Sequence, residues 1–249
     1  MSNESGIAWE RLIVEGAAIV ISILLAFWID AWWAEQQTIN QERAILAPLV
    51  VEIKELEQSI FDNRIFVGAM RDSMRQLLVA SASAEDKLSE GELDRLLADI
   101  HWYVSSNVIS IPTLDSLITS GDMDTISNAE LRRQLGRCLI NLDGLKIEIK
   151  RDGEFYDSIY IPYILKHTSM VQYFNLESRR PGFPDVTYPY DVIPLESQIS
   201  HRDMLMDREF QNILLQRITT LTNILEWPES QIEQNLKQIV ELIEHELAN

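Results

Sequence analysis

LIVEGAAIVISILLAFWIDAWW, residues 12–33, is the stretch of sequence that decides the fold. Before Asp30 it contains one ionisable residue, Glu15, and one further polar side chain, Ser22. A helix of about 20 such residues is roughly 30 Å long, which matches the hydrocarbon thickness of a bilayer. The stretch therefore predicts a transmembrane helix over residues 12–33, preceded by an N-terminal tail over residues 1–11.

Tryptophans lie at both ends of this stretch: Trp9 precedes it, and Trp28, Trp32 and Trp33 close it. On one helix, Trp9 and Trp32 are about 35 Å apart, so both can reach opposite headgroup layers, where tryptophan concentrates. A cleaved signal peptide would begin with basic residues, but the first ten residues contain no Lys or Arg. A core helix of a soluble protein would seldom end in paired tryptophans. We interpret the four tryptophans as interfacial anchors.

The whole chain is acidic, with a formal net charge of −18 over 249 residues and no long basic run. Such a surface repels nucleic acid, so nucleic-acid binding is excluded as a predicted function. The apolar fraction of 46% and the low counts of 9 Gly and 8 Pro favour a globular, helical domain. The single cysteine, Cys138, lies in a predicted helix and is interpreted as a small core residue.

A heptad repeat follows the apolar stretch and predicts a stalk helix over residues 34–80. One set of positions recurs every seven residues, and a second set follows three residues later. The predicted seam consists of Leu46, Leu49, Ile53, Leu56, Ile60, Val67 and Met70, with Ile39, Met74 and Leu77 at its ends and the polar Glu42 and Asn63 within it. Such a coiled-coil seam packs against another helix, and Pro48 is expected to kink it.

Residues 81–249 are predicted to form a helical bundle outside the membrane. Capping-box spacing at Ser89 and again at Ser127 marks two helix starts, and Gly121 marks a helix end after Pro112. Half of all prolines, together with several tyrosines and phenylalanines, fall between residues 172 and 199, which predicts an extended loop. The expected fold class is all-α: a transmembrane helix, a stalk helix and a bundle.

No motif for catalysis, cofactor binding or metal binding is present. The four histidines, His101, His167, His201 and His245, have no metal-ligand spacing and are interpreted as surface or helix-end residues. The sequence contains no phosphate-binding glycine loop, nucleophile elbow or paired cysteines. We therefore predict a protein that is not an enzyme and that needs no cofactor.

Glu15 is the residue whose position most needs a reason, because an ionisable group in hydrocarbon costs roughly 2 to 3 kcal/mol or more. Ala18, Ser22 and Ala26 follow it at steps of three and four, a spacing of small residues that lets two membrane helices approach closely. These four residues are the predicted packing face of the membrane helix. Alternatively, Glu15 reaches the interface, assisted by Arg11.

Two short motifs resemble a known family. They are the apolar anchor that ends Ile29-Asp30-x-Trp32-x-x-Glu35, and the later run Ser120-Gly121-Asp122-Met123, Ile126-Ser127-Asn128 and Glu130-Leu131-Arg132. They resemble a bacterial family of single-pass membrane proteins of unknown function. The resemblance implies an inner-membrane protein with its domain in the periplasm. This chain departs from the family in having Asp30 where Asn is usual and in lacking a basic segment before the anchor.

Three functions are compatible with these observations. The first is a non-catalytic interaction or scaffold protein, bound to membrane lipid, whose membrane helix and stalk associate with a second copy or another membrane subunit. The second is an ion- or proton-coupled component that uses Glu15. The third is a ligand sensor that binds near the loop at residues 172–199.

Overall fold

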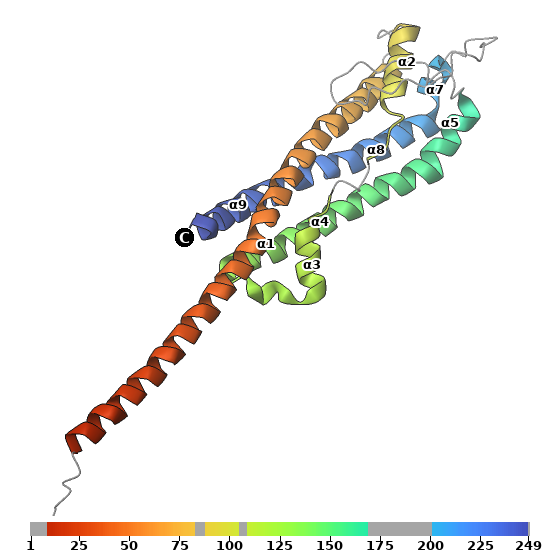
Figure 1. The fold of residues 1–249 in the computed structure, drawn as a ribbon. Helices are drawn as coiled ribbons and strands as arrows, with labels where there is room; N and C mark the ends of the chain where they lie inside the picture. Colours follow the sequence, from red (N-terminus) through yellow and green to blue (C-terminus); the bar gives the residue numbers. More distant parts are fainter. Residues whose placement is uncertain (1–8, 83–87, 105–108, 169–200, 249) are drawn as a thin grey trace, which may run out of the picture.

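The computed structural model describes residues 9–82, 88–104, 109–168 and 201–248. Within these ranges every regular element is a helix, which confirms the predicted all-α fold class. Figure 1 shows a bundle from which one helix extends far beyond the others.

That helix, α1 (Trp9–Ala82), is unbroken over 74 residues and is therefore about 110 Å long. It joins the apolar stretch to the bundle without an intervening linker. Pro48 lies inside it and removes one intrahelical hydrogen bond, yet α1 continues on both sides of it.

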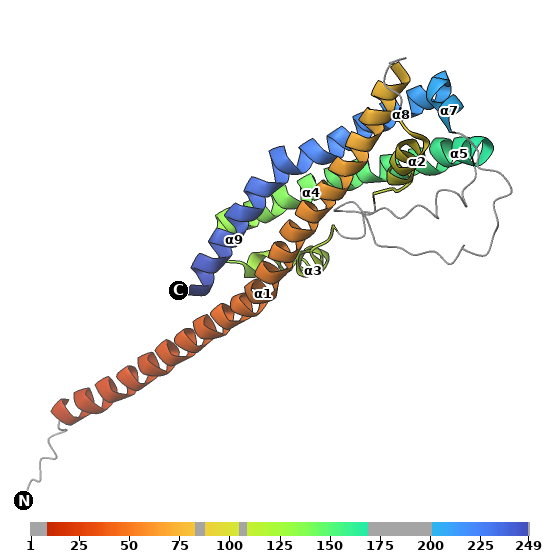
Figure 2. The same cartoon turned by 90° about the horizontal axis from the view of Figure 1, so that it is seen from above.

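The other helices lie along the C-terminal half of α1. The longest of them, α4, lies beside α8 and α9, and α8 and α9 also pack on α1 (Figures 1 and 2). In chain order the elements are α2 (Glu90–Asp99), α3 (Pro112–Ser120), the 3-10 turn η2 (Asp122–Thr125), α4 (Ala129–Phe155), the π-helical turn η3 (Tyr156–Tyr160), α5 (Ile161–His167), α7 (Arg202–Met206), α8 (Arg208–Trp227), the π-helical turn η4 (Pro228–Ile232) and α9 (Glu233–Ala248).

Two predicted helix boundaries are confirmed in detail. Ser89 caps α2 in a capping box, in which its side chain accepts from the backbone of Glu92 and the Glu92 carboxylate accepts from the backbone of Ser89. Pro112 opens α3, and Gly121 ends it with φ of 80°, in the left-handed region that glycine adopts without strain.

A third predicted boundary is wrong by one residue. The cap of α4 is Asn128, whose side-chain oxygen accepts from the backbone of Glu130 at 2.9 Å and Leu131 at 3.0 Å. Ser127 has a different partner, because its backbone N–H and its hydroxyl both donate to the Glu42 carboxylate. The distant acid on α1 thus displaces the cap to the next competent residue.

The heptad seam is buried inside the bundle. The seam residues are at most 4% exposed: Leu46, Leu49, Ile53, Leu56, Ile60, Val67, Met70, Met74 and Leu77. Their side of α1 is covered by helices of the same chain, above all α8, α9 and α2. The seam residues from Leu46 to Leu77 therefore lie in the bundle core and pack against helices of the same chain.

Candidate functional site

The apolar segment of α1, Ile13–Trp33, is the first candidate site. Among the described residues, α1 is the one helix long and apolar enough to cross a membrane. No side chain between Ile13 and Glu35 is buried. The large apolar side chains of the segment are 48 to 68% exposed. Contiguous apolar surface of this extent is rarely left open to water.

The predicted packing residues lie on this segment, and all four are exposed: Glu15, Ala18, Ser22 and Ala26. The Ser22 hydroxyl donates to the backbone oxygen of Ala18 at 2.7 Å, so its hydrogen-bonding capacity as a donor is used within the helix. Because a helix turns 100° per residue, steps of three and four place the four side chains on one side of α1. That side presents small residues at Ala18, Ser22 and Ala26, with Ile19 at its edge.

The predicted interfacial anchors occupy the C-terminal end of the segment. Trp28, Trp32 and Trp33 are 66%, 49% and 67% exposed. Trp9 begins α1, but its side chain lies outside the described side chains. The three described tryptophans therefore mark the level at which the apolar segment gives way to polar residues.

Two glutamates of α1 hold the bundle helices that lie nearest to the apolar segment. The Glu42 carboxylate accepts from Ser127 at the start of α4, at 2.8 and 2.9 Å. The Glu52 carboxylate accepts from the backbone and the hydroxyl of Thr113, in the first turn of α3, at 2.9 and 2.7 Å. Negative charge is favourable at a helix N-terminus, which explains why the seam tolerates an acid at position 42.

A buried ion pair lies near the other end of the bundle, which is the second candidate site. Arg217 of α8 pairs with Asp152 of α4 through two contacts, at 3.1 and 3.3 Å, and both side chains are at most 1% exposed. The guanidinium also donates to the backbone oxygens of Ile100, at 2.6 Å, and Trp102. Arg217 thereby ties the end of α2 to α4 and α8.

Aromatic rings surround this ion pair. The guanidinium carbon of Arg217 lies 5.0 Å from the ring centre of Tyr156 and 5.2 Å from that of Tyr160, which permits cation–π attraction. Burial, and secondly the charge of Arg217, lowers the pKa of His101 to about 4. Burial raises the pKa of Tyr156 to about 12. His101 and Tyr156 are therefore neutral at pH 7.

A second polar group lies in the same region. The two ring nitrogens of His201 lie 2.7 Å from Asp94 Oδ1 and 2.7 Å from Thr168 Oγ1. This is the order of a hydroxyl, an imidazole and a carboxylate in hydrolase triads, but the His201 side chain is completely buried. Ser73 and Asp99 form a further buried bond, 3.0 Å long, between α1 and α2.

These contacts modify the interpretation of the histidines and confirm that of the cysteine. His201 and His101 do lie at helix ends, but His201 is buried and His101 is mostly so. Within the described residues no group of three or more potential metal ligands occurs. Cys138 is buried, and burial raises the pKa of its thiol to about 12, as expected for an inert core residue.

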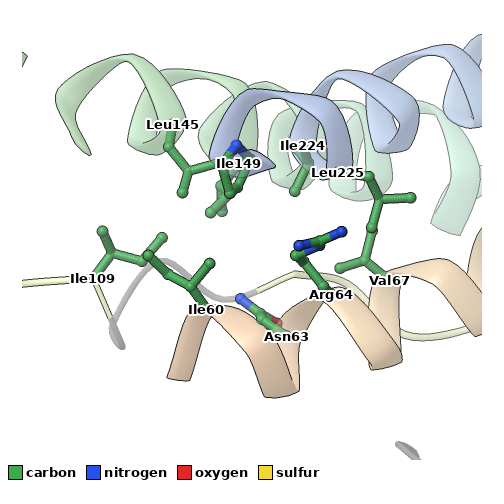
Figure 3. A pocket seen from close by; sticks show the side chains of 10 residues that line it. Ile60, Asn63, Arg64, Val67, Ile109, Leu145, Ile149, Ile224 and Leu225 are labelled. Carbon is green, nitrogen blue, oxygen red and sulfur yellow. The ribbon is translucent and has the colours of Figure 1, made fainter. Parts of the chain in front are cut away.

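A small pocket lies between α1, α4 and α8 (Figure 3). Its volume is about 10 Å³, enough for roughly one water molecule and far below the size of a metabolite site. It is lined by Ile60, Asn63, Arg64, Val67, Ile109, Leu145, Ile149, Ile224, Leu225 and Pro228. The predicted loop at residues 172–199 lies outside the described residues, so the sensor hypothesis gains no support here.

Comparison with known proteins finds no match: no protein family model, no curated protein and no solved structure matches this chain. The two candidate sites therefore stand on their own geometry.

The sequence analysis missed the buried ion pair. A signal for it exists in α8, where Arg217 lies three residues after Leu214 and four before Leu221, in the middle of the apolar stripe. A charged residue at such a position is buried and must be paired. The sequence does not indicate its partner, because Asp152 lies 65 residues earlier in another helix.

Proposed function

We propose that the protein is a non-catalytic interaction or scaffold protein of the bacterial inner membrane. In this proposal residues 12–33 cross the bilayer once and the bundle lies in the periplasm. The membrane helix associates with a second copy or with another membrane subunit, through Glu15, Ala18, Ser22 and Ala26.

One observation supports this proposal above the others. The two halves of α1 are both rich in apolar residues, but the seam from Leu46 to Leu77 is covered by the chain's own helices, while no side chain between Ile13 and Glu35 is buried. Lipid can cover the large apolar side chains of the segment. Its side of small residues offers lipid little contact and is suited to a neighbouring helix.

The two polar groups of the bundle support an architectural role for the domain. Arg217 is bonded to Asp152 and to backbone oxygens, and His201 lies between Asp94 and Thr168. Each group joins helices that are distant in sequence. Polar networks whose members are satisfied internally make a bundle rigid and specific.

A pair of matched variants tests the proposal. Ala18→Leu places a bulky side chain on the packing face, whereas Ala17→Leu makes the same change 100° further round the helix, away from Ser22 and Ala26. The full-length protein is extracted from its membrane in mild detergent and weighed by native mass spectrometry. We expect the wild-type chain of 28.7 kDa and the Ala17→Leu variant to appear in a complex. The Ala18→Leu variant should lose it.

Two results would contradict the proposal. The first is a wild-type chain that is monomeric in both detergent and lipid nanodiscs and copurifies with no other subunit. The second is equal loss of the complex in the two variants, which would show that the small residues do not form the contact.

A further inference from the structure

We propose that the partner is a second copy of this chain, and that the contact continues out of the membrane along residues 34–44 of α1, which we call the neck. This inference rests on the proposed function, since it names the partner and extends the surface. In this arrangement the two α1 helices lie parallel and back to back, with each bundle on the outer side.

The first argument is the phase of α1. Because α1 is one unbroken helix, the packing face of the apolar segment keeps its direction into the neck. Steps of three and four lead from Ala26 through Ile29 to Trp33, and from there to Gln37, Asn40 and Ala44. All of these residues are exposed.

The second argument is the position of the bundle. Asn40 and Leu49 are nine residues apart, which is two and a half helical turns, so they point to opposite sides of α1. Leu49 is 0% exposed and faces the bundle core. The neck face around Asn40 therefore points away from the side of α1 that carries the buried seam, and α3 lies beside the end of this face at Ala44.

The third argument is chemical complementarity. The chain has a net charge of −18, so two copies repel wherever charged surfaces meet. The neck has three charged residues: Glu35 and Glu42 are rotated by about 140° and 160° from Asn40, and Arg43, rotated by about 60°, borders the face. Gln37 and Asn40 are amides, each both donor and acceptor, so a face of amides complements an identical face. A row of acids or bases would not.

The surface is also shaped for a helix. Trp32, Trp33, Gln36, Gln37 and Asn40 line a shallow hollow on α1, together with Gln41 and Ala44. Gln41 and Ala44 also line a groove between α1 and α3. The groove has hydroxyl-bearing residues of α3 on its other wall, among them Ser116 and Ser120. The two hollows share Gln41 and Ala44, and α3 bounds the place where a second neck would lie.

Symmetry then makes a specific demand. Both copies enter the membrane in the same direction, so a closed dimer has its two-fold axis along the membrane normal. Residues on the face nearest that axis meet their own counterparts. Asn40 of one copy should therefore lie against Asn40 of its partner, while Thr38, rotated by 200°, should not.

Cysteine crosslinking in intact membranes tests this arrangement. Asn40→Cys is compared with Thr38→Cys, an exposed neighbour on the other side of the same helix. The wild-type chain provides the baseline, because its one cysteine, Cys138, is buried and its thiol has a pKa raised to about 12. Mild oxidation should convert Asn40→Cys into a disulfide-linked dimer and leave Thr38→Cys and the wild type monomeric.

A second measurement asks whether the contact is between like chains. Asn40→Glu and Asn40→Lys each place like charges against each other in a homodimer, so each chain alone should lose the dimer in native mass spectrometry. Coexpressed with different affinity tags, the two variants should form the mixed dimer.

The outcomes separate this inference from the function on which it rests. Crosslinking of Asn40→Cys to a protein of another mass, or a membrane complex without any product at position 40, would overturn the inference and leave membrane-helix association standing. Equal products from Asn40→Cys and Thr38→Cys would indicate random collision and would also overturn it. A chain that is monomeric in every assay would remove both.

Discussion

The two parts of α1 on either side of Gln41 are both rich in apolar residues but differ in how far their side chains are buried. From Ile13 to Gln41 no side chain is buried, whereas nine seam residues from Leu46 onward are at most 4% exposed. The difference lies in the pattern of the apolar residues, since residues 13–33 are apolar on nearly all sides and the part from Leu46 onward only along a heptad seam. A one-sided apolar stripe is covered here by helices of the same chain, whereas a helix that is apolar all round needs cover on every side, as a membrane provides.

The largest test of this comparison concerns the buried end of the bundle. Arg217→Met keeps the apolar stem but leaves the Asp152 carboxylate buried without its cation, which should destabilise the bundle by about 3–5 kcal/mol. Urea unfolding of the full-length protein in detergent, followed by circular dichroism, measures this. The double variant Arg217→Met with Asp152→Asn should recover part of the loss. A single variant as stable as the wild type would show that the pair is not structurally important.

A matched pair of leucines on α1 compares its two parts directly. Leu49 is 0% exposed and Leu24 is 62% exposed. Leu49→Ala should destabilise the bundle by about 2–5 kcal/mol, because it leaves a cavity in the core. Leu24→Ala should change the same unfolding transition by less than about 0.5 kcal/mol. Equal effects would contradict the division of α1 into a packed and an unpacked part.

The smallest expected effect sharpens the comparison within the bundle. A Cβ at Gly144 of α4 would lie 2.5 Å from Trp227 Cζ2, and the Trp227 ring is held by a bond from its Nε1 to the Asn141 oxygen at 2.9 Å. Gly144→Ala should therefore destabilise the bundle by about 1–3 kcal/mol.

The control is Gly136→Ala in the same helix, where nothing lies within 4 Å of the new methyl group. It should stabilise the bundle by about 0.5–1 kcal/mol, because alanine favours the helix over glycine. If both variants became more stable, this would contradict the close contact between the Trp227 ring and Gly144 of α4.

Local features of the fold were predictable from sequence, because their causes lie within a few residues. The capping box of α2 needs only Ser89 and Glu92, and the end of α3 needs only Gly121. The apolar stripes of α8 and α9 are visible in the sequence as three-four spacing.

Features that depend on distant partners were not predictable. Ser127 and Asn128 are both good cap residues, and the choice between them depends on Glu42, 85 residues earlier. The seam pattern indicates that some helix covers α1 but not that α8 and α9 of the same chain do so. Likewise, the buried His201 ring is hydrogen-bonded to Asp94 and Thr168, and neither residue is adjacent to it in sequence.

The unbroken course of α1 has a mechanical consequence. Because α1 has no break between its apolar segment and the bundle, the direction in which the bundle points around the helix axis is fixed relative to residues 13–33. Inserting one residue between Gln36 and Gln37 would rotate the bundle by about 100° relative to the apolar segment, whereas inserting seven would return it to within about 20°. The number of residues in the neck therefore sets the rotation of the bundle relative to the apolar segment.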